Sequence, residues 1–246
     1  MKTIDAVAVI LACSLVAVVA RQADPRARLD DVQRLSSQRN YTAAISAFEA
    51  IKAQQPDAIG SLDGLKMVTV YAETGDTAKF MALTRWMIQR WPTPKLSTEA
   101  ERQVKGYIVH KSAKDAQLIA RSVEMTRFAS EQATASGEGQ YQGFFDTSRG
   151  IALYRAGRYA EAAVWLPKAL NHESVYVRSL AQPFLAMTLR AQGNAARAAE
   201  LLAQARQTAA TLPAVGTTEY GVEWTDILIT RMVMKETEEV FASARD

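Results

Sequence analysis

The chain has few residues of the kinds that most often carry catalysis or bind metals. Its 246 residues include one cysteine, Cys13, and two histidines, His110 and His172. A single cysteine cannot form a disulfide within the chain or a cysteine-based zinc site. The histidines lie far apart in the sequence, and neither has a carboxylate at His-Glu-x-x-His spacing. We therefore expect no metal site, no cofactor and no enzymatic activity.

The chain also lacks a strong excess of either charge. It contains 29 lysines and arginines against 26 aspartates and glutamates, a formal net charge of +3. Nucleic-acid-binding proteins usually carry a clustered basic face, so we expect no nucleic acid as partner. Hydrophobic residues make up 48% of the chain, which is enough for a core, and strand-like alternation is scarce. The composition predicts an almost entirely helical protein.

Residues 6–20 form an uncharged, mostly apolar stretch between Asp5 and Arg21. As a helix it would be about 22 Å long, which is shorter than the ~30 Å hydrocarbon core of a membrane. This length favours a signal peptide that is cleaved after Ala20, so that the mature protein starts near Arg21. An uncleaved membrane anchor and a buried first helix are the alternatives. We expect a protein that is exported (periplasmic or secreted) or anchored to a membrane by its N-terminus.

The stretch 150–170 predicts a helical hairpin. Small and apolar residues recur every three or four positions on both sides of a Gly157-Arg158 turn: Gly150, Leu153 and Tyr154 before it, and Ala162, Leu166 and Ala169 after it. Small side chains at Gly150 and Ala162 indicate that the two helices cross closely. Pro167 should remove a backbone hydrogen bond and kink the second helix.

The same arrangement recurs around Arg39-Asn40, Gly75-Asp76 and Gly193-Asn194. A helix–turn–helix unit of about 34 residues with these features is typical of a tetratricopeptide (TPR) repeat. Residues 98–135 match the pattern poorly but still predict a hairpin with a break near residues 111–115. Thr98 and Glu101 have the spacing of a capping box at its start. The expected fold is all-α: a TPR-like right-handed α-solenoid of four to five helical hairpins with a C-terminal capping helix.

The expected organisation divides the chain into five parts. Residues 1–23 are a signal peptide or membrane anchor, and residues 24–95 form two TPR-like hairpins. Residues 96–143 form a degenerate helical hairpin and a loop. Residues 144–210 form two TPR repeats, and residues 211–246 form a loop and the capping helix, whose apolar positions begin at Trp224. A terminal helix with one apolar and one charged side is expected to close the end of the solenoid.

Much of the chain resembles the C-terminal TPR region of planctomycete-type serine/threonine kinases and related WD-repeat proteins. The residues that carry the resemblance are Thr74-Gly75-Asp76 with Phe80, Gly150-Ile-Ala-Leu-Tyr-Arg-Ala-Gly-Arg-Tyr159, Phe184-Leu-Ala-Met187 with Gly193, and the stretch Trp224 to Val240. The kinase motifs themselves are missing. The resemblance implies a stand-alone repeat module without kinase activity.

In this repeat class the first helix of each pair lines a concave groove. The groove positions of the two best units give the predicted binding residues Ile151, Tyr154, Arg155, Phe184, Met187 and Arg190. Aromatic, methionine and arginine side chains are enriched at binding surfaces. We expect these side chains on one exposed side, in contact with a protein or peptide. The predicted function is a non-catalytic protein-interaction scaffold. The alternatives are an envelope assembly or peptide-capture factor and, less favoured, an enzyme that uses the groove as a pocket.

Overall fold

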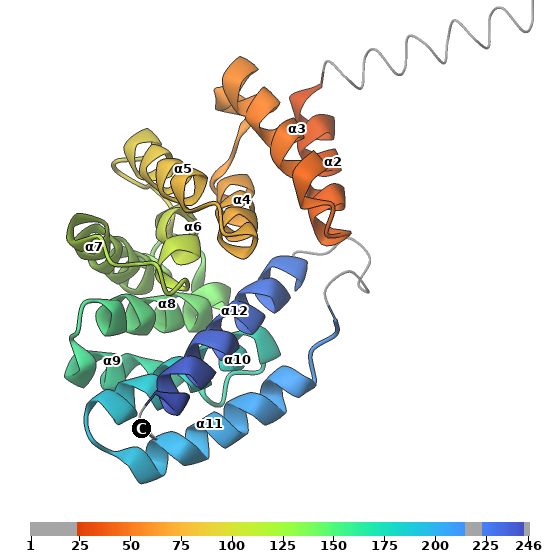
Figure 1. The fold of residues 1–246 in the computed structure, drawn as a ribbon. Helices are drawn as coiled ribbons and strands as arrows, with labels where there is room; N and C mark the ends of the chain where they lie inside the picture. The colour runs from red at the N-terminus through yellow and green to blue at the C-terminus, as the bar shows by residue number, and fades with distance from the viewer. Residues whose placement is uncertain (1–23, 215–222, 244–246) are drawn as a thin grey trace, which may run out of the picture.

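The computed structural model describes residues 24–214 and 223–243 (Figure 1). Within these ranges the chain forms eleven α-helices and no strand, so the predicted all-α class is confirmed. The predictions for residues 1–23, including the apolar stretch 6–20, lie outside the described residues. No helix in the described ranges has both the length and the apolar character needed to cross a membrane.

The helices follow one another with short connections. The α-helices are α2 (Pro25–Ser37), α3 (Tyr41–Gln54), α4 (Ser61–Thr74), α5 (Thr77–Arg90), α6 (Ser97–Ile108), α7 (Ala116–Gln132), α8 (Gln142–Arg155), α9 (Tyr159–Trp165), α10 (Val175–Ala191), α11 (Ala195–Ala210) and α12 (Glu223–Ala242). Three short 3₁₀ helices, η1 (Pro56–Ala58), η2 (Gly139–Tyr141) and η3 (Leu166–Ala169), connect or extend them.

Consecutive helices pack in pairs, α2 with α3, α4 with α5, α6 with α7, α8 with α9, and α10 with α11. The first helices of successive pairs also pack on one another, because α4 contacts α6, α6 contacts α8, and α8 contacts α10. Figure 1 shows α5, α7 and α9 along one side of the molecule, with α4, α6, α8 and α10 nearer to α12. We call the side of α4, α6, α8 and α10 that faces α12 the inner face.

The turns within four pairs lie where the sequence predicts them. Gly75, Gly157 and Gly193 each adopt a positive φ, between 71° and 82°. Glycine reaches this left-handed region without the steric cost of a Cβ atom and commonly ends a helix there. Arg39 adopts φ 63° at the corresponding position of the first pair without that freedom.

The predicted close crossing of α8 and its partner helix is confirmed. A Cβ atom added to Gly150 would lie 2.6 Å from Cγ of Leu166, and Ala162 is fully buried. The predicted kink at Pro167 is also confirmed, because α9 ends at Trp165 and continues as the 3₁₀ helix η3. Proline cannot donate the backbone hydrogen bond that α-helical geometry requires there.

The capping box predicted from Thr98 and Glu101 is wrong. The helix α6 begins at Ser97, and its first amides are capped by Glu138 from the loop before η2. One Glu138 oxygen accepts hydrogen bonds from the amides of Ser97 and Thr98 at 2.6 and 3.2 Å, and the other accepts from the Thr98 hydroxyl at 2.6 Å. Glu101 points inward instead, where its carboxylate accepts a hydrogen bond from Ser148 of α8.

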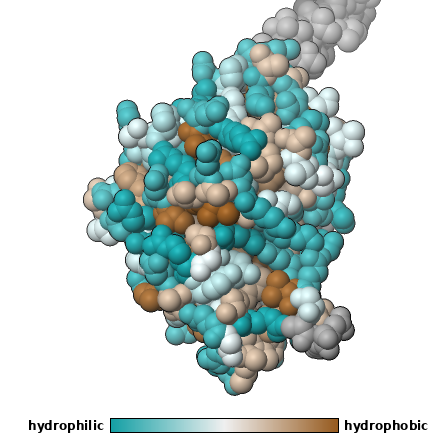
Figure 2. All heavy atoms as spheres, turned by 60° about the vertical axis from the view of Figure 1, so that its left-hand side comes forward, coloured by the Kyte–Doolittle hydropathy of each residue, from teal (hydrophilic) through white to brown (hydrophobic). Residues whose placement is uncertain are grey.

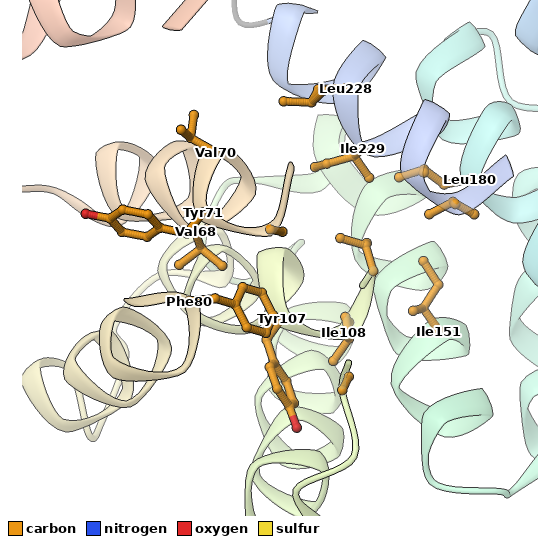
Figure 3. Close-up of a cluster of buried hydrophobic side chains, with 14 of the residues drawn as sticks. Val68, Val70, Tyr71, Phe80, Tyr107, Ile108, Ile151, Leu180, Leu228 and Ile229 are labelled. Carbon is orange, nitrogen blue, oxygen red and sulfur yellow. The ribbon is translucent and has the colours of Figure 1, made fainter. Parts of the chain in front are cut away.

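The expected position of the C-terminal helix at the end of the array is also wrong. Although α12 packs on α10 and α11, it runs back along the inner face and reaches α4. Figure 3 shows Leu228 and Ile229 of α12 in the same apolar cluster as Ile108, Ile151 and Leu180. Burial of this apolar side favours the inner face over the end of the last pair, because the inner face offers contacts with several first helices at once.

Candidate functional site

The inner face is covered by one side of α12. The apolar residues of that side are at most 1% exposed: Trp224, Ile227, Leu228, Ile229 and Val233. They belong to the main hydrophobic core, together with residues of α2, α4, α6, α8 and α10. The position in which a groove ligand was expected is therefore occupied by a segment of the same chain.

The predicted binding residues do lie together on the inner face, but the expectation that they are exposed is wrong. Ile151, Phe184 and Met187 are at most 1% exposed. Tyr154, Arg155 and Arg190 are only half-buried as whole residues, and two of them contact α12 directly. The repeat pattern placed the six residues on the same face of the helices, as observed. It did not predict their burial, because it assigned no helix that covers these side chains.

Arg155 makes the most extensive polar contact between the inner face and α12. Its Nη2 atom lies 2.7 Å from Oε2 of Glu236, its Nη1 donates to the other oxygen, and its Nε donates to the carbonyl of Ile108 at 2.7 Å. The side chains of Arg155 and Glu236 are 7% and 9% exposed. A bidentate pair that is almost fully buried fixes the rotation and the register of α12.

The guanidinium of Arg155 also lies 5.2 Å from the ring centre of Phe184 and 5.6 Å from that of Tyr154. Burial and the nearby Glu236 carboxylate raise the pKa of the Tyr154 hydroxyl to about 12. At the C-terminal end of the same contact, Arg190 lies 4.8 Å from the ring centre of Phe241 on α12. Four of the six predicted residues, Tyr154, Arg155, Phe184 and Arg190, thus form aromatic and cationic contacts beside α12.

A second buried charge cluster lies at the N-terminal end of α12. The Lys105 ammonium is 3.5 Å from Oε1 of Glu101 and 3.4 Å from Oδ1 of Asp226. Ser148 donates a hydrogen bond of 2.8 Å to the same Glu101 oxygen. Burial alone would lower the pKa of Lys105, but the Glu101 and Asp226 carboxylates outweigh it and hold that pKa above its ordinary value. Lys105 is therefore charged at neutral pH.

Further polar contacts follow the length of α12. Lys111 and Glu239 are 2.6 Å apart, and Arg206 and Glu238 are also 2.6 Å apart, both at exposed positions. The Ser179 hydroxyl of α10 and the Thr230 hydroxyl of α12 lie 2.8 Å apart in the buried part of the contact. Carboxylates of α12 therefore meet cations of the helix array near both ends of the helix, and a hydroxyl pair lies between them.

Beside the C-terminal half of α12, the inner face remains open to solvent. A hollow of about 650 Å³ is lined by Lys111, Lys114, Tyr154, Arg155, Tyr159, Glu236 and Glu239. The rings of Tyr154 and Tyr159 are 5.6 Å apart. Of the six predicted residues, Tyr154 and Arg155 line this accessible surface, and the loop cations Lys111 and Lys114 are members that the repeat pattern did not predict.

A second hollow, of about 570 Å³, lies beside α7 and is lined by Ile119, Val123 and Glu124 of that helix together with Arg155 and Arg158. Figure 2 shows that the side carrying α5, α7 and α9 is mostly hydrophilic, with small and separate hydrophobic patches. The half-buried Trp86 and Trp91 pack edge to face, with ring centres 6.0 Å apart, and Arg90 lies 5.3 Å from each ring. These contacts account for the tryptophan pair as local packing around Arg90.

Both histidines have local structural contacts. His110 accepts a hydrogen bond from the amide of Ser112, and His172 accepts one from the amide of Ser174, so each stabilises the chain where a helix has ended. Burial lowers the pKa of His110. In the described ranges, no three residues among histidine, cysteine, aspartate and glutamate are grouped so that they could hold a metal ion.

Comparisons with known proteins give no match. No protein family, no curated protein and no solved structure is similar enough to this chain to be matched.

Proposed function

We propose that the protein is a non-catalytic interaction scaffold, a TPR-like solenoid of five helical hairpins whose inner face binds an amphipathic helix. The packing of each pair on the next supports the solenoid arrangement. The observation that carries the functional proposal is α12 itself, an amphipathic helix that the inner face already holds through apolar contacts and ion pairs. A face that binds such a helix in the same chain has the chemistry to bind one from a partner.

The charges on the inner face indicate what a partner helix carries. Lys105, Lys111 and Arg155 each pair with a carboxylate of α12, so a competing helix needs acidic residues at the corresponding spacing. Its apolar side must provide large residues at the positions of Trp224 and Ile227. The partner is therefore an acidic amphipathic helix that replaces α12. No nucleic acid is expected on a face that already selects carboxylates.

The contact of α12 combines apolar packing with ion pairs and a hydroxyl pair. Ion pairs at both ends and the hydroxyl pair of Ser179 and Thr230 can be exchanged for equivalent pairs with another helix. Because α12 is tethered, its effective concentration at the inner face is on the order of millimolar or higher. A partner helix must therefore bind tightly, or the docking of α12 must be weakened first.

A disulfide that locks α12 in place tests the proposal. Ser179→Cys and Thr230→Cys place two sulfurs where hydroxyls lie 2.8 Å apart, which is compatible with disulfide geometry. Cys13→Ser removes the only other thiol. The probe is a fluorescent peptide of residues 223–242, and the readout is its anisotropy. We expect binding to the reduced protein and none to the oxidised protein, because the locked helix cannot leave.

Two controls make this experiment decisive. The same peptide with Glu236→Lys and Glu239→Lys should bind neither form, because its charges would face Arg155 and Lys111. In the intact chain, Glu239→Lys should increase peptide affinity, because it weakens the docking of α12 at an exposed position. Equal binding to the oxidised and reduced forms would place the peptide elsewhere, and no binding to the reduced protein or its Glu239→Lys variant would mean that α12 is permanent core.

A further inference from the structure

A small cavity lies beside the first turn of α12, on the opposite end of the helix from the open hollow. Its volume is about 110 Å³. Apolar side chains of α4, η2 and α8 form most of its wall: Leu62, Leu65, Tyr141, Phe144 and Phe145. Tyr141 stands at the rim and is 40% exposed. An engineered protein cavity of about 150 Å³ binds benzene, so this space accommodates a short branched aliphatic group.

The polar side of the cavity holds two carboxylates around one ammonium. Glu101, Lys105 and Asp226 line it, and one ammonium lies between two carboxylates at 3.5 and 3.4 Å. In the described part of the chain, neither carboxylate forms an ion pair with another cation. A single ammonium therefore contacts both carboxylates at a position largely shielded from water. Such a position favours a ligand that brings a positive charge.

A second observation points independently to a ligand. Thr225 also lines the cavity and is only 3% exposed, yet its hydroxyl has no hydrogen-bond partner within the described structure. Nearly all buried polar side-chain atoms in proteins are hydrogen-bonded to protein or to ordered water, so this hydroxyl needs a partner in the cavity. The hydroxyl can both donate and accept, so it suits a polar group of a small molecule in this space.

The opposite charge is provided at the same cavity by Arg102. This residue of α6 lines the cavity and is half-buried. Among the described residues, its guanidinium forms neither a hydrogen bond nor an ion pair, although most arginines of the helix array are paired. A planar guanidinium with free donors is well suited to a carboxylate, which it can bind through two parallel hydrogen bonds.

From these features we infer that the cavity binds a small apolar α-amino acid. The ammonium group of the ligand lies beside Glu101 and Asp226, its carboxylate pairs with Arg102, and its side chain enters the apolar wall around Leu65 and Phe145. Each end of this zwitterion meets side chains of opposite charge, and the Thr225 hydroxyl provides a further hydrogen bond. The volume selects a side chain of about the size of valine or leucine.

The inference goes beyond the proposed interaction with a helix and does not depend on it. Because Asp226 and Thr225 belong to α12 whereas Glu101 and Arg102 belong to α6, a bound ligand would bridge the two helices. It would therefore bind the state in which α12 is docked and stabilise that state.

Calorimetric titration of the full chain with alanine, valine, leucine and phenylalanine tests the inference. Two analogues of leucine separate its groups: 3-methylbutylamine lacks the carboxylate, and 4-methylpentanoate lacks the ammonium. We expect saturable binding of valine or leucine, with shifts in the methyl resonances of Leu62 and Leu65. The affinity of each analogue should be at least about tenfold lower than that of leucine, because a charge-assisted hydrogen bond is lost.

Two substitutions provide matched controls. Arg102→Gln removes a side chain that forms no hydrogen bond or ion pair with the other described residues, so the protein should melt as the parent does. It should weaken leucine binding about tenfold and leave the binding of 3-methylbutylamine unchanged. Leu62 is half-buried at the edge of the cavity, so Leu62→Trp should fill the cavity and abolish the binding of leucine and of 3-methylbutylamine.

Three results would overturn the inference. The first is that none of the four amino acids binds, and the second is that 4-methylpentanoate binds as tightly as leucine. The third is that Arg102→Gln leaves the affinity for leucine unchanged. Because these titrations do not require α12 to leave, they can succeed where the locking experiment fails, and the reverse also holds.

Discussion

Breaking the buried pair of Arg155 and Glu236 tests whether α12 is docked as the structure shows. Removing one partner of a buried ion pair typically costs ~3–5 kcal/mol, because the remaining charge stays buried without compensation. In Glu236→Gln, Arg155 keeps its bond to the Ile108 carbonyl and its two aromatic neighbours, so we expect about 3 kcal/mol, the lower end. For a domain of this size, that loss lowers Tm by roughly 6–12 °C.

The assay is urea unfolding at neutral pH, followed by circular dichroism, for Glu236→Gln, Arg155→Met and the double variant Arg155→Met with Glu236→Met. The double variant should recover much of the stability lost in either single variant, because two apolar side chains leave no unpaired buried charge. Arg206→Gln is the control, since its pair with Glu238 is exposed and should contribute only about 0–1 kcal/mol. A loss below about 1 kcal/mol in Glu236→Gln would refute the reasoning, because that value is typical of an exposed pair.

Three further perturbations test the helix array. Gly150→Ala should cost about 1–3 kcal/mol, because its methyl group would meet Leu166; thermal unfolding checks this, and Gly150→Ala with Leu166→Val should recover part of the loss. Glu138→Gln should cost about 1 kcal/mol at neutral pH through the weakened cap of α6. Burial raises the pKa of Glu138, but hydrogen bonds from Thr98 and the α6 amides outweigh burial, so the pKa lies below its ordinary value. The stabilisation by this cap is therefore complete above the unfolded pKa of about 4.3 and disappears as the pH falls through the folded pKa. The variant should therefore show a flatter acid unfolding profile than the parent. Burial lowers the pKa of His110, so the parent should lose stability as the pH falls below about 6.5, and His110→Asn should lose less over the same range; identical pH profiles would contradict this.

The positions of the helices could be predicted because each depends on residues that are close in sequence. The turns at Gly75, Gly157 and Gly193 follow from the tolerance of glycine for a positive φ. The end of α9 follows from the missing amide of Pro167. The close approach at Gly150 follows from the absence of a side chain within a helical apolar pattern. In each case the reason lies within one or two helical turns of the residue.

The cap of α6 could not be predicted in the same way. The local sequence offers Thr98 and Glu101 at suitable spacing, but the carboxylate that reaches back to the amides of Lys95 and Leu96 is Glu99. The amides of Ser97 and Thr98 are capped by Glu138, from a loop that follows α7. Glu101 is drawn inward by Ser148 and Lys105 instead. A carboxylate can satisfy several competing partners, and the choice depends on which of them the fold brings within hydrogen-bond distance.

The sequence by itself determined the all-α class, the turns at Gly75, Gly157 and Gly193, and the register that places Ile151, Tyr154 and Phe184 on one face. Only the tertiary structure decided that α12 lies on that face, that Arg155 pairs with Glu236, and that the face is covered. The amphipathic pattern of α12 shows that one side must be buried, but it does not specify the surface against which it is buried. That choice depends on the summed contacts with helices distant in sequence, which no local pattern of residues contains.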